Sequence, residues 1–129
     1  MSIRRVVPNF QSKNPKESRK FYADFLGMNI GMDMEWIISF VSPDNPTAQL
    51  SVISEDPMAH IHPDCSIEVS DTMELYKKAA KLDLKIVYPL TDEPWGVRRF
   101  FVEDPNGRVV NVMQHIGEGG RTQIKSRKS

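Results

Sequence analysis

The clearest pattern of hydrophobic and polar positions lies near the C-terminal end of the chain. Residues 97–102 and 109–113 are rich in β-branched and aromatic side chains, which is typical of strands. Between them stands Asp-Pro-Asn-Gly, in which Pro105 presets φ for a turn and Gly107 accepts a positive φ. This pattern predicts an antiparallel β-hairpin.

One order of elements occurs twice along the chain. Residues 4–11 and 65–69 are predicted strands, and a helix follows each, capped by Asn14 in the first case and by Asp71 in the second. The two caps lie 57 residues apart, which indicates an internal repeat of about half the chain. Further strands are expected after each helix, at 28–34, 35–41 and 47–53, and at 84–88, 97–102 and 109–113.

The first predicted helix opens with a capping box, in which Asn14 is the cap and Glu17 stands three residues later. Pro15 suits the first helical position, and Gly27 ends the helix. Its aromatic stripe favours burial in the core over a stacking site, and consists of Phe21, Tyr22 and Phe25. The apolar face expected for the second helix consists of Leu75, Ala79 and Leu82.

Composition narrows the class of protein. A chain of 129 residues with 40% apolar and 26% charged side chains fits one globular domain with a buried core. The net charge of zero gives no electrostatic case for nucleic acid, and no apolar run approaches the ~20 residues of a membrane span. The single cysteine, Cys65, excludes an internal disulfide and favours a cytoplasmic location, and its place in a strand favours a small buried side chain over a nucleophile.

Three features together resemble a known family: the repeat, the Phe21-Tyr22 pair followed by Leu26-Gly27, and the turn at 104–107. They resemble the vicinal oxygen chelate superfamily, which includes glyoxalase I, the bleomycin-resistance proteins, fosfomycin-resistance transferases and extradiol dioxygenases. The resemblance implies an α+β fold with two βαβββ modules, whose sheets curl into a mixed sheet around a central cleft that binds small molecules. One domain is expected over 1–116, with modules at 3–53 and 64–115 and a disordered tail at 117–129.

The resemblance also bears on metal binding. In metal-dependent members four side chains of the cleft hold a divalent ion, and the matching positions here are Val7, Gln49, Asp64 and Asn111. Valine has no donor atom and amide oxygens are weak ligands, so only Asp64 supplies charge. No catalytic metal and no cofactor are therefore expected. The histidines are interpreted as solvated or half-exposed rather than as ligands, at His60, His62 and His115.

Strand alternation extends these positions into a wall of the cleft. For the strand at 97–102, resemblance to the lyases places Arg99 and Phe101 inward. The expected ligand-binding residues are Asn9, Trp36, Gln49, Asp64, Glu68, Trp95, Arg99, Phe101, Asn111 and Met113. Aromatic surface with a few polar groups suits a planar, partly charged molecule. The alternatives are core filling by Trp36 and Phe101, and an ion pair of Arg99 with Asp64 or Glu68.

The sequence leaves two main interpretations of the function, and a third that is less favoured. The missing donor at Val7 favours a metal-free small-molecule-binding protein of the bleomycin-resistance type, acting in antibiotic resistance. The alternative is a metal-dependent lyase, dioxygenase or thiol transferase, with the metal held by Asp64, Gln49 and Asn111 and with His115 as an additional candidate ligand. An acid–base enzyme that uses Asp64 or Glu68 is a third interpretation. The resemblance also implies a homodimer, in which a partner chain completes the cleft in some relatives.

Overall fold

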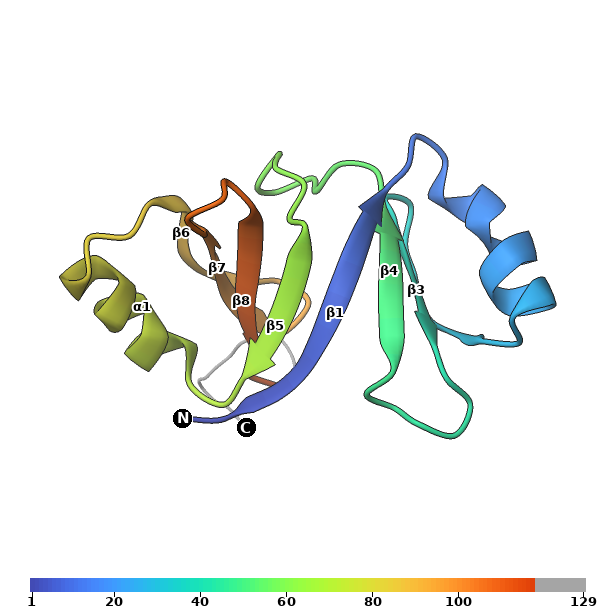
Figure 1. Ribbon diagram of the computed structural model, residues 1–129, viewed down its shortest axis with the longest axis horizontal. Coiled ribbons are helices and arrows are strands. Elements are labelled where there is room, and N and C mark those ends of the chain that lie inside the picture. Colours follow the sequence, from blue (N-terminus) through green and yellow to red (C-terminus); the bar gives the residue numbers. More distant parts are fainter. Residues whose placement is uncertain (118–129) are drawn as a thin grey trace. The chain divides into compact units, whose positions relative to one another are not determined.

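The structure is a computed structural model that describes residues 1–117 (Figure 1). The order of strand, helix and three strands occurs twice, which confirms the predicted repeat and the α+β class. The chain forms two compact units, which we call the N-terminal unit (Val6–Cys65) and the C-terminal unit (Met1–Arg5 and the residues from Ser66 onward). No helix within residues 1–117 is long and apolar enough to cross a membrane. The predicted tail lies, except for Gly117, outside the described residues.

The N-terminal unit is a four-stranded sheet in the order β2-β3-β4-β1. Its strands are β1 (Ile3–Gln11), β2 (Asn29–Asp33), β3 (Ile37–Val41) and β4 (Gln49–Ile53). β1 runs parallel to β4, and the other pairs are antiparallel. The register places Asn9 opposite Ser51 and Ser51 opposite Ser39, so the three form one row across three strands.

The helical segment of this unit differs from the predicted helix. It consists of a 3-10 turn, η1 (Pro15–Ser18), followed by a π-helix, η2 (Lys20–Phe25). The predicted capping box is wrong, because within the described residues the Asn14 side chain makes no capping hydrogen bond. The 3-10 turn instead uses the backbone, where Glu17 N donates to Asn14 O at 3.2 Å. Gly27 ends the segment with φ +81°, as predicted.

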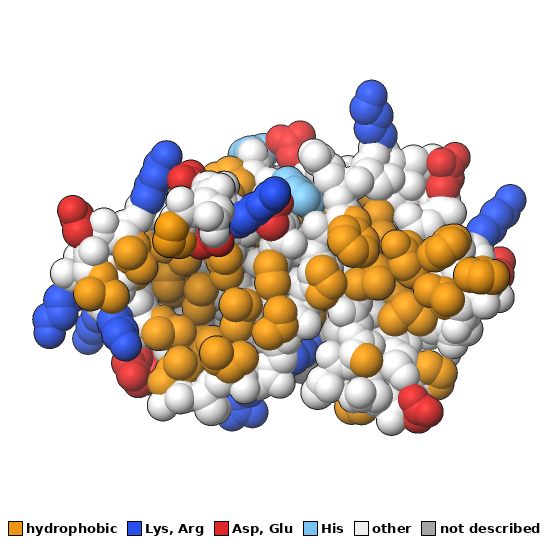
Figure 2. Space-filling model, viewed as in Figure 1, with side chains coloured by type: hydrophobic (Ala, Val, Ile, Leu, Met, Phe, Trp, Pro, Cys, Tyr) orange, Lys and Arg blue, Asp and Glu red, His pale blue; other side chains and the backbone are white. Residues whose placement is uncertain are grey.

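The aromatic stripe of this segment is only partly buried, which corrects the expectation that it fills the core. Tyr22 packs on Phe40 with ring centroids 5.2 Å apart, and Phe40 belongs to the buried core of the unit. Phe21 and Phe25 are 53% and 72% exposed. The α-helical period does not hold here, because Leu26 N reaches back five residues to Phe21 O. Hydrophobic side chains are accordingly visible on the surface of this unit (Figure 2).

The C-terminal unit is a sheet in the order β5-β8-β7-β6, with one α-helix. Its elements are β5 (Cys65–Val69), α1 (Thr72–Lys81), β6 (Ile86–Glu93), β7 (Val97–Glu103) and β8 (Val109–His115). The predicted cap of α1 is confirmed, because Asp71 Oδ1 accepts a hydrogen bond from Glu74 N at 3.1 Å. The first residues of the chain join this unit through Ser2 N, which donates to Ser70 Oγ at 2.8 Å.

The core of the C-terminal unit lies between α1 and one face of the sheet. Phe100 of β7 meets Tyr76 of α1 with ring centroids 5.1 Å apart, and Ala79 is buried beside them. Leu75 packs against this cluster as predicted, but Leu82 is 58% exposed, because it follows the last helical residue and lies beyond the buried stripe.

The hairpin that the sequence predicted is present. β7 and β8 pair from Val97 opposite His115 to Glu103 opposite Val109. Gly107 has φ +83°, and Asp104 Oδ1 accepts hydrogen bonds from the backbone N–H groups of Asn106 and Arg108 at 2.8 and 2.9 Å. The bond from Arg108 in particular holds the pKa of Asp104 below its ordinary value. The turn therefore fixes the register that decides which side chains share a face.

Candidate ligand-binding site

The side chains predicted to point inward, Arg99 and Phe101, lie on the face of the hairpin opposite α1. Side chains alternate along β7, so Phe100 points into the core beneath α1 while Arg99 and Phe101 lie on the other face. Arg99 stands opposite Met113 and Phe101 opposite Asn111 on β8. All four side chains are buried, at 9% exposure or less. This face therefore combines apolar surface with a charged and an amide group.

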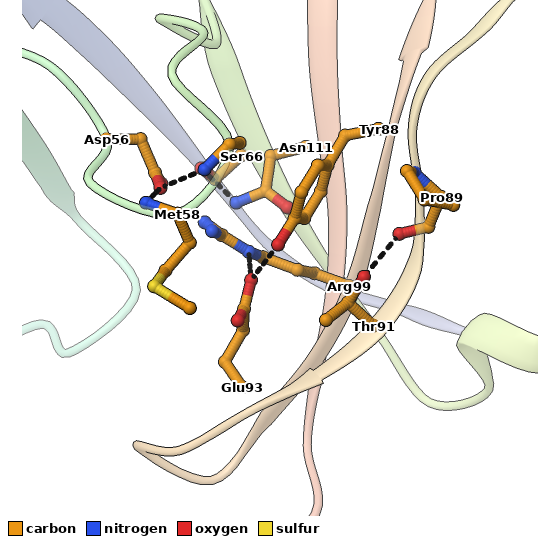
Figure 3. A network of polar contacts seen from close by, with 10 residues as sticks. Asp56, Met58, Ser66, Tyr88, Pro89, Thr91, Glu93, Arg99 and Asn111 are labelled. Atoms are coloured by element: carbon orange, nitrogen blue, oxygen red, sulfur yellow. Dashed lines mark hydrogen bonds and ion pairs between the residues drawn. The ribbon is translucent and has the colours of Figure 1, made fainter.

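The main polar interaction on this face is an ion pair between Arg99 and Glu93. Arg99 Nε donates to Glu93 Oε2 at 2.7 Å, and the two side chains are 5% and 1% exposed. Tyr88 of β6 donates its hydroxyl to the same oxygen at 2.8 Å. Figure 3 shows the phenol and the guanidinium directed at one carboxylate oxygen. The pair satisfies the rule that a buried charge needs a partner of opposite sign.

Three aromatic rings surround the Arg99 guanidinium. Its Cζ atom lies 5.2 Å from the ring centroids of Tyr88 and Trp95 and 5.0 Å from that of Phe101. Such distances allow cation–π attraction, which is stronger where water is excluded. Trp95 lies in the turn between β6 and β7 and is 37% exposed, so part of its indole faces outward. We call Tyr88, Glu93, Trp95, Arg99 and Phe101 the Arg99 cluster.

Two buried oxygen atoms on this face accept no hydrogen bond within residues 1–117: Glu93 Oε1 and Asn111 Oδ1. The amide nitrogen of Asn111 is used, since Nδ2 donates to Ser66 Oγ at 3.1 Å (Figure 3). Leaving a buried acceptor without a donor typically costs about 1–3 kcal/mol. Such atoms are rare in folded proteins, and a bound molecule is one way to satisfy them.

The pKa of Tyr88, the tyrosine of the Arg99 cluster, is shifted by its surroundings. Burial, and then the hydrogen bond to the Glu93 carboxylate, raises the pKa of Tyr88 above its ordinary value. Tyr88 is therefore a protonated donor at neutral pH, which keeps one oxygen of Glu93 occupied.

Glu68 of β5 belongs to a separate charged group with Arg5 of β1 and His115 of β8. Its carboxylate oxygens lie 2.5 Å from Arg5 Nε and 3.1 Å from His115 Nδ1. Burial raises the pKa of Glu68, but the hydrogen bond from His115 and the charge of Arg5 outweigh burial, so the pKa lies below its ordinary value. A carboxylate with a lowered pKa is a weak base, which argues against the acid–base interpretation for Glu68.

The other predicted site residues lie in the N-terminal unit. Asn9 is 6% exposed, and its backbone N–H donates to Asp64 O at 3.0 Å. The side chain of Gln49 donates from Nε2 to Pro46 O at 3.1 Å, so it is held by its own turn. Trp36 precedes β3 rather than lying in it, which corrects its placement on a strand. That the residues of the two units face one cleft stays a prediction.

The metal positions of the family do not fit a metal in this chain. Val7 is buried and has no donor atom, and the amides of Gln49 and Asn111 are neutral. Residues 1–117 contain no group of three His, Cys, Asp or Glu side chains placed to hold an ion. We therefore derive no chemical step from a metal.

The N-terminal unit also has an open hollow of about 670 Å³ at the ends of β1 and β4. It is lined by Gln11, Ser12, Lys13, Ser54, Glu55, His60 and His62. His60 Nδ1 lies 3.3 Å from Glu55 Oε2, and both side chains are about 70% exposed. This agrees with the interpretation of His60 as a solvated loop residue.

Cys65 stands at the start of β5 and is half-buried rather than fully buried. Burial raises the pKa of its thiol, and the charge of Asp64 adds to this effect. A raised pKa leaves little thiolate at neutral pH, which argues against a nucleophile.

Comparison with known proteins places the chain in a family. A family model matches residues 4–112, and it describes the Glyoxalase/Bleomycin resistance protein/Dioxygenase superfamily. The chain belongs to this superfamily. The match confirms the resemblance that the repeat and the turn at 104–107 suggested. The comparison with curated proteins gave no match.

Solved structures share the fold of this glyoxalase-superfamily chain at low identity. A superfamily member from Vibrio splendidus 12B01 has a TM-score of 0.65 at 18% identity, covering 88% of this chain and 99% of that one. A Legionella pneumophila protein described as an NAD-dependent benzaldehyde dehydrogenase has a TM-score of 0.66 at 21% identity, covering 85% and 98%. A hypothetical protein from Bacillus halodurans C-125 has 0.68 at 11%, covering 94% and 100%. At these identities the likeness concerns the fold alone.

Glu93 and Tyr88 of this superfamily member were not predicted from the sequence as site residues. β6 was expected to end at residue 88, but it continues to Glu93 and pairs with β7. The sequence did contain a signal for ion pairs across this hairpin, because Asp92-Glu93 precedes the turn and Arg98-Arg99 follows it. In a hairpin, acidic and basic side chains on either side of a turn face one another across the strands.

Proposed function

We propose that the protein binds a small planar molecule against the face of the C-terminal sheet that carries the Arg99 cluster, and that it does so without a catalytic metal. One observation supports this most directly: a buried, paired guanidinium among three aromatic rings, beside two acceptor oxygens that lack donors in the described chain. Ligand sites in proteins are mostly apolar with a few placed polar groups, and this face has that composition. Membership of the superfamily is consistent with a small-molecule function.

The metal-free part of the proposal rests on the donor chemistry of the family's metal positions. Valine has no donor atom at position 7, and two of the other three positions carry neutral amides. Divalent transition ions require several imidazole, thiolate or carboxylate ligands for tight binding. We therefore favour a binding protein over the metal-dependent lyase, dioxygenase or transferase.

Ligand screening by thermal denaturation tests the binding function. A ligand at a hundred times its Kd should raise the free energy of unfolding by about 2.7 kcal/mol. Hits should bind at least about tenfold more weakly to Trp95→Ala, because this variant removes an exposed ring from the cluster. A library of planar metabolites and drugs that leaves the melting temperature unchanged would contradict the proposal.

Elemental analysis of protein purified without chelators tests the absence of a metal. Less than about a tenth of an equivalent of zinc, nickel, iron or manganese is expected, because tight transition-metal sites need more charged or imidazole ligands than these positions offer. A stoichiometric metal that is lost in Asp64→Ala would support the enzyme instead.

We also propose that the protein is a homodimer. β2 is the edge strand of its sheet, and all five of its residues are exposed, including Ile30 and Met32. Exposed apolar edge strands favour association with a second chain. Light scattering after gel filtration should give twice the 14.8 kDa chain mass, and a monomer at all concentrations would contradict the proposal.

An antibiotic-resistance function predicts that expression raises the inhibitory concentration of a drug that the protein binds.

A further inference from the structure

We infer that the ligand of the Arg99 cluster presents hydrogen-bond donors, as an amidine or an amino-substituted aromatic ring does, and that Glu93 Oε1 and Asn111 Oδ1 accept them. The inference rests on the proposed binding function of this cluster and names the chemistry of its ligand. It differs from the expectation that a guanidinium clamps an anionic ligand.

The two carboxylate oxygens of Glu93 differ in the number of hydrogen bonds that they accept. Oε2 accepts two hydrogen bonds, from Arg99 Nε at 2.7 Å and from the Tyr88 hydroxyl at 2.8 Å. Oε1 accepts none among the described residues, although the side chain is only 1% exposed. A carboxylate offers about four lone-pair sites, so half of this acceptor is left for a donor from outside the described chain.

Asn111 stands opposite Phe101 on the same face. Its amide nitrogen is turned to Ser66, which leaves Oδ1 buried and without a donor in residues 1–117. Tyr88 stands opposite Phe101 on the other side, so Tyr88, Phe101 and Asn111 form one row across three strands. The two buried atoms of this face that lack a partner within residues 1–117 are therefore both acceptors.

The charges of the cluster disfavour an anionic ligand. The Arg99 guanidinium is already engaged by the Glu93 carboxylate and by three rings. An anionic ligand at this place would bring a second negative charge close to a buried carboxylate, which is unfavourable where water is excluded. A neutral or cationic ligand with N–H groups meets the acceptors without this repulsion, and the exposed part of Trp95 offers it a flat surface.

Benzamidine and benzoate test this directly, because they share one ring and nearly one shape but present donors and acceptors respectively. Binding is measured by calorimetry and by the nuclear magnetic resonance signals of Arg99 Nε–H and the Trp95 indole N–H. The indole signal is assigned by comparison with Trp36→Phe. Benzamidine should bind at least about tenfold more tightly than benzoate, the factor that one hydrogen bond to a charged group provides, and should shift both signals.

Two variants with the same change of charge separate the site from general electrostatics. Glu93→Gln keeps the shape but replaces one carboxylate oxygen by a donor, so benzamidine should bind at least about tenfold more weakly and benzoate more tightly. Asp92→Asn is the matched control, because Asp92 pairs with Arg98 on the other face of the same hairpin. It should leave both affinities unchanged. Should Glu93→Gln not fold, Asn111→Ala should weaken benzamidine binding by at least about threefold.

The outcomes distinguish the inference from the proposed function. Benzoate binding at the cluster as tightly as benzamidine would overturn the inference and leave the binding function standing. Equal losses in Asp92→Asn and Glu93→Gln would also overturn it, since net charge would then explain the preference. If neither probe nor neutral benzamide shifts the Arg99 and Trp95 signals, both the inference and the proposed function at this site are wrong.

Discussion

Arg99 and Glu93 form a buried ion pair across the turn of one hairpin, with Nε and Oε2 2.7 Å apart. The same hairpin carries a second pair on its other face, in which Arg98 Nε lies 2.7 Å from Asp92 Oδ1 with side chains 28% and 48% exposed. The Nε–carboxylate distance is the same in the two pairs, but the exposed pair is bidentate, since Arg98 Nη2 also donates to Asp92 Oδ2 at 3.1 Å. A comparison of the two pairs therefore contrasts a buried pair with a better-bonded but solvated one.

We expect Arg99→Met to lower the free energy of unfolding by about 3–5 kcal/mol, because it leaves the Glu93 carboxylate buried without its charged partner. Arg98→Met should cost less than about 1 kcal/mol, because its pair is solvated. Urea denaturation measures both. Adding Glu93→Leu to Arg99→Met should restore most of the loss, and a double variant as unstable as the single one would contradict this account.

The titration of Tyr88 should report the neighbouring carboxylate. Burial and the hydrogen bond to Glu93 raise the pKa of Tyr88 above its ordinary value of 10.0. Because the folded state holds this proton more tightly, the associated stability is lost as the pH rises through that raised pKa. Ultraviolet absorbance of the phenolate should show one late titration that Tyr88→Phe removes. Glu93→Gln should shift it to lower pH, and no shift would show that Glu93 does not act on the phenol.

Glu68 should contribute to stability at acidic pH. Burial raises its pKa, but His115 and Arg5 lower it by more, so the folded value lies below the ordinary 4.5. This stability is therefore present above pH 4.5 and is lost as the pH falls through the folded pKa. Unfolding free energies measured between neutral and acidic pH should decline less steeply in Glu68→Gln. An identical slope in the two proteins would show that the Arg5–Glu68–His115 contacts do not persist in solution.

The two helical segments end in the same left-handed conformation with different residues, at Gly27 with φ +81° and at Asp83 with φ +59°. Gly27→Ala should cost about 1 kcal/mol from conformation alone, because an added Cβ would meet no atom within 4 Å. Asp83→Gly should instead raise stability, by less than that amount. Chemical denaturation tests both, with Gly31→Ala as a control that lacks a positive φ and gains an ordinary 3.5 Å contact with Val41 Cγ1. A loss of stability in Asp83→Gly would contradict the argument.

The sequence by itself determined the features that depend on residues close together in the chain. The turn at 104–107, the Asp71 cap and the end of the first helical segment at Gly27 are all where the pattern predicted them. Each is decided by φ preferences or by a side chain that bonds the backbone a few residues away. The repeat, the Phe21-Tyr22 pair followed by Leu26-Gly27 and the turn at 104–107 were enough to suggest the superfamily, which the family model confirms.

Only the tertiary structure decided which side chains are buried and which pair with each other. β6 continues to Glu93, beyond the predicted end of the strand, and Phe25 is exposed to solvent rather than buried in the core. The pairing of Glu93 with Arg99 depends on strand register and on the rings that exclude water, and both arise from packing between strands. A sequence read residue by residue shows which groups can form an ion pair, but burial decides what that pair contributes.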